Sequence, residues 1–225
     1  MKALVILAFI ADPAFGQLGP LIYSQAPNRN FGFASDSLFR DDFGQIQGSL
    51  YADRFQVSAA AVLGQLVWYG LYGAQDQGFD PEPPISESFR IRLFSQVNSP
   101  IPPLQLPADV LYETSTDAVF REFNGAFVNG RREYRYILNL PMSFTIQPGT
   151  PYWLEISQIG DVNSFFRWES STGGERAFEF PLGSTWQMAT GGQLAYELRV
   201  PEPMTGSFVA VVVLARATRR SNSSR

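Results

Sequence analysis

The stretch SFRIRLF, residues 88–94, decides the fold class, because apolar and charged side chains alternate along it without a break. Phe89, Ile91 and Leu93 occupy alternate positions, and an arginine stands between each pair of them. Successive side chains of a β-strand point to opposite faces of its sheet, so this period predicts a strand with one buried and one wet face.

Similar patterns occur on both sides of this stretch. REYRYILNL (132–140) and PYWLEIS (151–157) alternate in the same way, whereas AVLGQLVWYGLY (61–72) is almost continuously apolar. The first two predict strands with one wet face, and the third predicts a strand buried on both faces. No window shows a helical apolar stripe bounded by capping residues.

Two dipeptides predict tight connections between these strands. Asn129-Gly130 precedes REYRYILNL and favours a two-residue hairpin turn, since both residues tolerate positive φ. Pro148-Gly149 precedes PYWLEIS and fits a type II turn. Dense strands and frequent turns predict an all-β fold, a two-sheet antiparallel β-sandwich of jelly-roll-like type; a closed barrel is the alternative.

The composition narrows the possible chemistry. The 225 residues include no Cys and no His, and the only Lys is Lys2. This excludes Ser-His-Asp triads, His- or Cys-based metal centres, and Schiff-base or phosphate-loop lysines. Carboxylates, Arg, Tyr and hydroxyls remain available for chemistry.

The N-terminal residues predict export. MKALVILAFIADPAFGQ has one Lys, an apolar stretch, and small residues at the spacing that a signal peptidase requires. We therefore predict a signal peptide over 1–16, an N-terminal strap or irregular edge strand over 17–40, and a β-sandwich domain over 41–199. The alternative for the first segment is a buried strand.

Without residues 1–16 and those after Pro203, twelve basic and twenty acidic residues remain, a net charge of −8. An acidic surface disfavours nucleic acid as a partner, because phosphate binding requires clustered Lys or Arg.

Three groups of residues are candidates for binding or catalysis. Asp76, Asp80 and Glu82 lie in an oxygen-rich segment that would suit a structural Ca²⁺, the alternative being a solvated loop. Trp153 and Trp186 are the aromatic residues most expected to be exposed, and they are the candidates for stacking on sugar rings. A glycosidase would need two carboxylates across a cleft, for which the strand-like segments offer Glu155, Glu169 and Glu197.

The C-terminal segment 200–225 carries a distinctive order of features. VPEP at 200–203 contains Pro201, Glu202 and Pro203; an apolar run follows from Phe208 to Ala215, and then the basic residues Arg216, Arg219 and Arg220. This order resembles a PEP-CTERM sorting signal, and Arg216 makes the apolar run short. The alternative is a C-terminal strand with a basic tail.

The resemblance implies processing partners and a destination. It implies export by a Gram-negative bacterium, transient anchoring in the inner membrane, and cleavage by the membrane protease exosortase after signal peptidase has acted. An apolar segment with basic residues on its cytoplasmic side fits such an anchor. The mature protein would then lie at the cell surface or in the extracellular matrix.

The central part is also similar to a module that precedes such tags in secreted bacterial proteins. The similarity rests on DDF (41–43), WYGLY (68–72), FRIRLFS (89–95), YRYILNLP (134–141), QPGTPYWLEI (147–156) and LAYEL (194–198). It implies a β-sandwich and no particular activity. We therefore predict a non-catalytic role in adhesion, matrix structure or binding of extracellular polysaccharide; the alternative is a carboxylate-based polysaccharide hydrolase.

Overall fold

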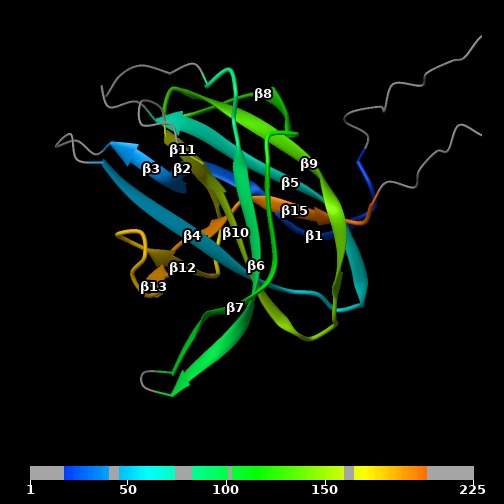
Figure 1. Ribbon diagram of the computed structural model, residues 1–225. Helices are drawn as coiled ribbons and strands as arrows, with labels where there is room; N and C mark the ends of the chain where they lie inside the picture. The colour runs from blue at the N-terminus through cyan, green and yellow to red at the C-terminus, as the bar shows by residue number, and fades with distance from the viewer. Residues whose placement is uncertain (1–17, 41–45, 74–82, 101–102, 160–164, 202–225) are drawn as a thin grey trace, which may run out of the picture.

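The fold of the protein is built from strands alone. The computed structural model describes residues 18–40, 46–73, 83–100, 103–159 and 165–201, and within these ranges it contains strands and no helix (Figure 1). In chain order the strands are β1 (Leu21–Gln25), β2 (Pro27–Ala34), β3 (Asp36–Arg40), β4 (Ile46–Gln56), β5 (Ala61–Gly73), β6 (Phe89–Pro100), β7 (Pro103–Thr116), β8 (Phe120–Val128), β9 (Arg131–Ile146), β10 (Pro151–Gln158), β11 (Phe165–Ser171), β12 (Glu175–Glu179), β13 (Gln187–Thr190), β14 (Gln193–Leu194) and β15 (Tyr196–Arg199).

The strands form two sheets. The eight-stranded sheet has the order β1-β15-β5-β11-β14, with β9 also paired to β5, β8 to β9, and β2 to β11. The seven-stranded sheet has the order β13-β12-β4-β3-β10-β6-β7. Apart from the single contact between β3 and β10, the pairings are antiparallel. The predicted all-β fold of two antiparallel sheets is confirmed.

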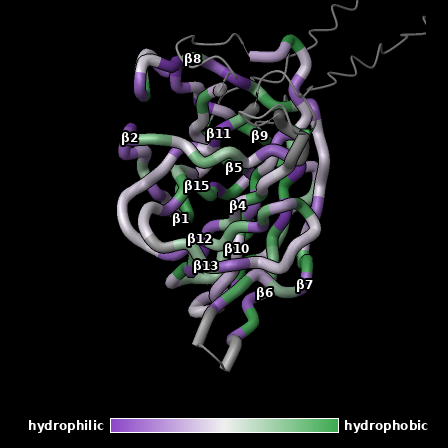
Figure 2. Tube along the Cα trace, turned by 90° about the vertical axis from the view of Figure 1, so that its left-hand side faces the viewer, coloured by the Kyte–Doolittle hydropathy of each residue, from purple (hydrophilic) through white to green (hydrophobic). Residues whose placement is uncertain are grey.

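The strand that the sequence defines most clearly is the start of β6. Phe89, Ile91 and Leu93 are almost completely buried, while the arginines between them lie on the other face and are partly exposed. Hydrophobic and hydrophilic residues also alternate along other strands of the two sheets (Figure 2). The continuously apolar stretch is β5, and both of its faces are buried as predicted.

The two predicted turns are also present. Asn129 and Gly130 connect β8 to β9 with φ of 51° and 80°. Asn and Gly are the residues that adopt such positive φ values most readily. Gly149 has φ of 69° in the connection between β9 and β10, as a type II turn after Pro148 requires.

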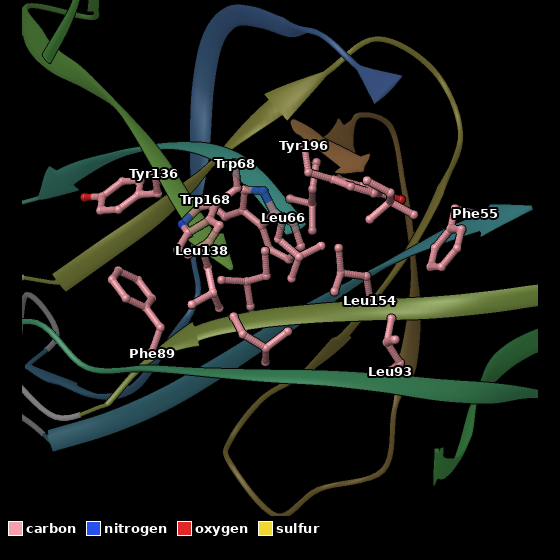
Figure 3. Packing of buried hydrophobic residues seen from close by; sticks show 14 of the residues in the cluster. Phe55, Leu66, Trp68, Phe89, Leu93, Tyr136, Leu138, Leu154, Trp168 and Tyr196 are labelled. Carbon is pink, nitrogen blue, oxygen red and sulfur yellow. The ribbon is translucent and has the colours of Figure 1, made fainter. Parts of the chain in front are cut away.

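The main hydrophobic core lies between the two sheets (Figure 3). The ring of Trp68 stacks on Tyr136 within the eight-stranded sheet, with centroids 5.3 Å apart and planes 5° from parallel. Phe89 from the seven-stranded sheet packs edge-on against both rings. These aromatic contacts join the sheets, because each buried ring removes a large apolar area from water.

A second apolar cluster covers part of the outer face of the seven-stranded sheet. It contains Ala52, Phe94, Trp153 and Ala177, with partly buried residues packed against it: Leu106, Trp186 and Met188. Leu106 belongs to β7 and Met188 to β13, and these two edge strands contact each other. The edges of the sheet therefore approach each other over this face, which the strand pattern alone predicts to be wet.

The prediction that PYWLEIS has one wet face is wrong, because the second apolar cluster and its edge strands cover that face. Trp153, Glu155 and Ser157 occupy that face of β10, and all three are fully buried. The alternation of side chains is as predicted, but the strand is covered on both sides.

The two ends of the described chain lie side by side. The amide of Val200 donates to the carbonyl oxygen of Pro20 over 3.0 Å, and Arg199 donates to the carbonyl of Gly19 over 2.7 Å. Pro201 packs directly on Gly64, where a Cβ atom would lie 2.1 Å from the proline ring. The strands of the segment 17–40 belong to both sheets, with β1 at an edge.

Among the described residues no helix is long and apolar enough to span a lipid bilayer. The predicted signal peptide, and the tag beyond Pro201, lie outside the described residues.

Candidate functional site

A polar cleft of about 320 Å³ opens where two connections meet. One wall is the segment Ile85, Ser86 and Glu87, which leads into β6. The other wall is the connection from β7 to β8, with Asp117 and Val119, followed by Arg121 at the start of β8. These walls meet because β7 pairs with β6 up to Phe89, and the chain then crosses to the other sheet.

Glu87 is the central side chain of this cleft, and only 11% of it is exposed. Its Oε1 atom accepts a hydrogen bond from the hydroxyl of Tyr72 and a longer one, 3.4 Å, from the hydroxyl of Tyr136. Its Oε2 atom forms an ion pair with Arg121. Gln158 donates to the Tyr72 hydroxyl over 3.2 Å. The carboxylate is therefore held at one oxygen by two buried tyrosine hydroxyls and at the other by the partly exposed Arg121.

Burial determines the proton affinities in this cluster. It raises the pKa of Glu87, and the hydrogen bonds from Tyr72 and Arg121 offset part of that increase. It also raises the pKa values of Tyr72 and Tyr136 well above the ordinary tyrosine value, since an ionised phenol would be desolvated beside Glu87. Both tyrosines therefore remain protonated and act as donors.

Arg121 forms the outer side of the cluster. Its guanidinium lies over the ring of Tyr134 at 5.4 Å from the centroid, and it also donates to the carbonyl of Pro84 over 3.5 Å. Asp117, on the same wall as Arg121, is exposed, and its carboxylate forms no ion pair with a described residue. The cleft thus offers a partly exposed guanidinium, carboxylate oxygens and the Ser86 hydroxyl to a ligand, with apolar contact surface from Ile85 and Val119.

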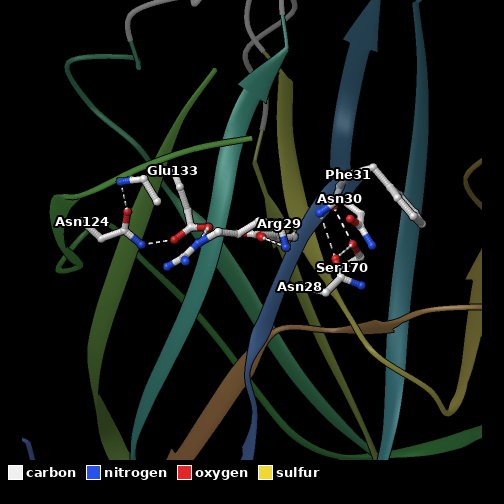
Figure 4. A network of polar contacts seen from close by, with 9 residues as sticks. Asn28, Arg29, Asn30, Phe31, Asn124, Glu133 and Ser170 are labelled. Carbon is white, nitrogen blue, oxygen red and sulfur yellow. Dashed lines mark hydrogen bonds and ion pairs between the residues drawn. The ribbon is translucent and has the colours of Figure 1, made fainter. Parts of the chain in front are cut away.

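A second acidic cluster lies on the outer face of the eight-stranded sheet, and we call it the sealed cluster because its two carboxylates are closed to solvent. Figure 4 shows Glu133 of this cluster between Asn124 and Arg29. Glu133 of β9 and Glu169 of β11 are fully buried there. Glu133 accepts a hydrogen bond from Asn124 of β8 and forms an ion pair of 3.4 Å with Arg29 of β2. The backbone amide of Arg29 donates to Glu169 over 2.9 Å. β2 and β8 therefore cover the two glutamates.

Glu169 favours its protonated form beside Glu133. Burial, together with the hydrogen bond and charge of Glu133, raises the pKa of Glu169 to about 9, and Arg29 offsets only part of this increase. Oε2 of each glutamate is buried and has no other hydrogen-bond partner, which a proton between the carboxyl groups would provide. One arginine and one proton then balance two carboxylates, so the cluster is neutral.

A third buried carboxylate lies between the sheets. Asp53 of β4 accepts hydrogen bonds from Gln25 over 3.0 Å and from the backbone amide of Leu194 over 2.6 Å. Desolvation raises its pKa to about 8 in spite of these bonds. Because both donors belong to the eight-stranded sheet, Asp53 joins the two sheets.

The predicted aromatic sugar site is not formed as expected. Trp153 is fully buried in the second apolar cluster, so its indole has no face free for a sugar ring, and that prediction is wrong. Trp186 is partly buried, and its ring packs edge-on against Phe94 at 5.7 Å. Neither tryptophan lines the cleft. A role for Trp186 in glycan binding stays a prediction.

The glutamates that the sequence offered for catalysis do not meet each other. Glu155 is fully buried between Arg90 and Arg92. Glu169 lies in the sealed cluster, and Glu197 pairs with Arg199 and accepts from Tyr69. None of these three lines the cleft.

Several predicted site residues lie outside the described residues: Asp76, Asp80, Glu82, Glu202, Pro203, Arg216, Arg219 and Arg220. Within the described ranges no group of three or more acidic side chains is placed to hold a metal ion. The structure does not test the predicted calcium site, which therefore stays a prediction.

The sequence analysis missed Glu87, Asp117 and Arg121 as a group. Two of them lie in connections without a recognisable motif, and 34 positions separate Glu87 from Arg121. One signal was available: Tyr72 and Tyr136 lie on inward positions of their strands, and a buried tyrosine hydroxyl requires a hydrogen-bond partner.

A family model described as a domain of unknown function, DUF7901, matches residues 21–207. The chain belongs to the DUF7901 family. The DUF7901 match begins at the first residue of β1, so it includes the strands of the segment 17–40 and everything that forms the cleft and the sealed cluster. No curated protein matches this DUF7901 chain.

Proposed function

We propose that this protein is an exported, non-catalytic β-sandwich that binds extracellular polysaccharide through the Glu87 cleft, at the cell surface or in the matrix. The observation that carries the proposal is the cleft itself. Within it, hydrogen-bonding groups of both kinds converge beside apolar side chains, which is the combination that a sugar, with its hydroxyl edges and C–H faces, requires.

The state of Glu87 supports binding rather than catalysis. Both of its oxygens are occupied, one by tyrosine hydroxyls and the other by Arg121. A carboxylate held in this way is rigid, and it orients the guanidinium towards the cleft. Preorganised polar groups of this kind raise affinity and specificity, because little side-chain freedom is lost when a ligand binds.

Binding to immobilised glycans tests the proposal. The wild-type domain should bind at least one glycan class, and Arg121→Ala should remove that binding while the melting temperature changes little. Arg199→Ala is the matched control, since Arg199 is also an ion-paired arginine but lies outside the cleft. A blank array for the wild-type protein would contradict the proposal.

Export and sorting are the second part of the proposal. The paired ends of the described chain support it. A signal peptide over 1–16 and a tag over 200–225 would be attached to the domain at neighbouring positions. Mass spectrometry of the secreted protein should find a mature C-terminus close to Pro203. An intact C-terminus at Arg225 on a soluble protein would contradict this part.

One observation favours a polysaccharide hydrolase as the alternative. Glu87 and Asp117 line the same cleft, and a raised pKa is typical of a general acid. Glu87→Gln and Asp117→Asn should each abolish release of reducing sugar if this alternative is correct. Binding without turnover by the wild-type protein would support the non-catalytic function.

A further inference from the structure

We infer that the ligand of the Glu87 cleft carries an amino group, as a deacetylated amino sugar of a polysaccharide does. The inference rests on the proposed function and names the chemical class of its ligand. It is based on the charges of the cleft and on which of them are already balanced.

The positive charge of the cleft is already paired with a carboxylate. Arg121 forms its ion pair with Glu87, and its guanidinium also lies over Tyr134 and donates to Pro84. A ligand carboxylate would have to compete with Glu87 for this arginine. Among the described residues that line the cleft, none offers a free cation for an acidic sugar such as a uronate.

The negative charge of Asp117, in contrast, is not paired with a cation of the described residues. Asp117 is exposed, and within the described part of the chain its carboxylate has no ion-pair partner. The connection around it is ordered by hydrogen bonds from Val119 to the Asp117 carbonyl, 2.9 Å, and from Ala118 to the Thr116 hydroxyl, 3.0 Å. Val119 also packs against the main core. The carboxylate is thus presented at the cleft from a fixed backbone.

Together, Glu87, Arg121 and Asp117 give the cleft one net negative charge. The domain between the predicted processing sites carries a net charge of −8, which adds to the attraction for cations and the repulsion of anions. A hydroxyl-rich ligand with an ammonium group satisfies both features: the ammonium pairs with Asp117, and the hydroxyls bond to the exposed edges of Arg121 and Ser86.

Apolar contact in the cleft suits the same ligand. Ile85 is completely exposed at one wall, and Val119 lines the other. The C–H face of a pyranose ring gives such side chains a partner, whereas a simple diamine would offer them little shape to contact. The charge and the apolar contact therefore point to an amino sugar rather than to a small cation.

Calorimetric titration of the purified protein with three probes tests the inference. The probes are a glucosamine tetramer, its N-acetylated form and a galacturonic acid tetramer, at mildly acidic pH so that the amine is protonated. We expect binding of the glucosamine tetramer, about tenfold weaker binding of the acetylated form, and no binding of the uronate. Salt should weaken the first interaction by screening it.

Two variants of exposed aspartates assign the effect to one residue. Asp117→Asn should weaken binding of the glucosamine tetramer about tenfold and leave the acetylated tetramer unchanged. Asp109→Asn, on β7 and outside the cleft, is the matched control and should leave both unchanged. Equal melting temperatures for the two variants show that folding is not the cause.

The outcomes separate the inference from the function on which it rests. Equal affinity for the free and acetylated tetramers, preferred binding of the uronate, or equal behaviour of the two variants would overturn the amino-sugar inference and leave polysaccharide binding standing. No binding of any probe, together with a blank glycan array, would overturn both.

Discussion

The Glu87 cleft and the sealed Glu133–Glu169 cluster each combine carboxylates with one arginine, but only the first has a carboxylate that is exposed to solvent. In the cleft the charges need not balance, because water solvates the exposed carboxylate of Asp117. In the sealed cluster both glutamates are fully buried, and Arg29 balances only one of them. The comparison shows that exposure decides how an acidic cluster is stabilised: by water where it is open, and by a proton where it is closed.

The largest expected effect is the pH dependence of the sealed cluster. The folded protein holds the Glu169 proton up to a pKa of about 9, whereas the unfolded chain releases it near the ordinary value of 4.5. Stability from this group is therefore fully present below the ordinary value and is lost as pH rises towards 9. We expect Glu169 alone to lower the free energy of unfolding, measured with urea, by about 3–6 kcal/mol across this range.

Glu169→Gln provides the control for this pH profile. The amide keeps the shape of the protonated acid and cannot ionise, so the variant should lose the part of the decline that comes from Glu169. A decline of similar size should remain, since the pKa of Asp53 is raised from 3.8 to about 8 and acts in the same direction. A decline of the same size in the wild-type protein and in the variant would contradict the raised pKa of Glu169.

The next effect concerns Arg29, which forms an ion pair with Glu133 in the described part of the chain. Arg29→Ala should lower the free energy of unfolding by about 1–2 kcal/mol at neutral pH, a value reduced by the 57% exposure of the side chain. The decline of stability should also extend to higher pH, because the charge of Arg29 lowers the pKa of Glu169 in the wild-type protein. Urea unfolding at several pH values measures both changes.

Arg29→Gly separates charge from backbone strain at the same position. Arg29 has φ of 57°, which glycine adopts more readily than a residue with a Cβ. The glycine variant loses the same charge, but it should be less destabilised than the alanine variant, by up to about 1 kcal/mol. If both variants match the wild-type protein, the arginine does not stabilise the sealed cluster.

Pattern reasoning predicted the sheets well because local chemistry determines them. Alternation in SFRIRLF fixed which side chains of β6 face the core, and Asn129-Gly130 fixed a hairpin. Both features depend only on neighbours in the chain. The covering of outer faces does not: Trp153 is buried because β7 and β13, far apart in sequence, approach each other over it.

The candidate sites were harder to predict for the same reason. Glu133 and Glu169 lie on strands that both flank β5, and only the order of strands reveals that they meet. Glu87 becomes important through Tyr72, Tyr136 and Arg121, which come from three different elements. A single sequence offers residue types and local periods, and these sites depend on topology.

A smaller effect on stability is expected in the cleft. Glu87→Gln retains an acceptor for the tyrosine hydroxyls and removes the ion pair with Arg121. We expect a loss of about 0.5–1 kcal/mol, since Arg121 is 26% exposed and can be rehydrated. The variant should also lose its preference for the glucosamine tetramer, because the cleft becomes neutral. If Glu87→Gln lowered the free energy of unfolding by several kcal/mol, the ion pair in the cleft would be as important for stability as the buried carboxylates of the sealed cluster.

The smallest expected effect comes from Arg121→Lys, which keeps the charge of the cleft and changes the shape of the cation. The ammonium of lysine can pair with Glu87, but it stacks less well over Tyr134 and cannot form two parallel hydrogen bonds. We expect the free energy of unfolding to change by no more than about 0.5 kcal/mol. The preference for the glucosamine tetramer over the uronate should remain, because the net charge is unchanged, while absolute affinity falls. Preferred binding of the uronate by this variant would show that the geometry of the guanidinium, and not the charge of the cleft, selects the ligand.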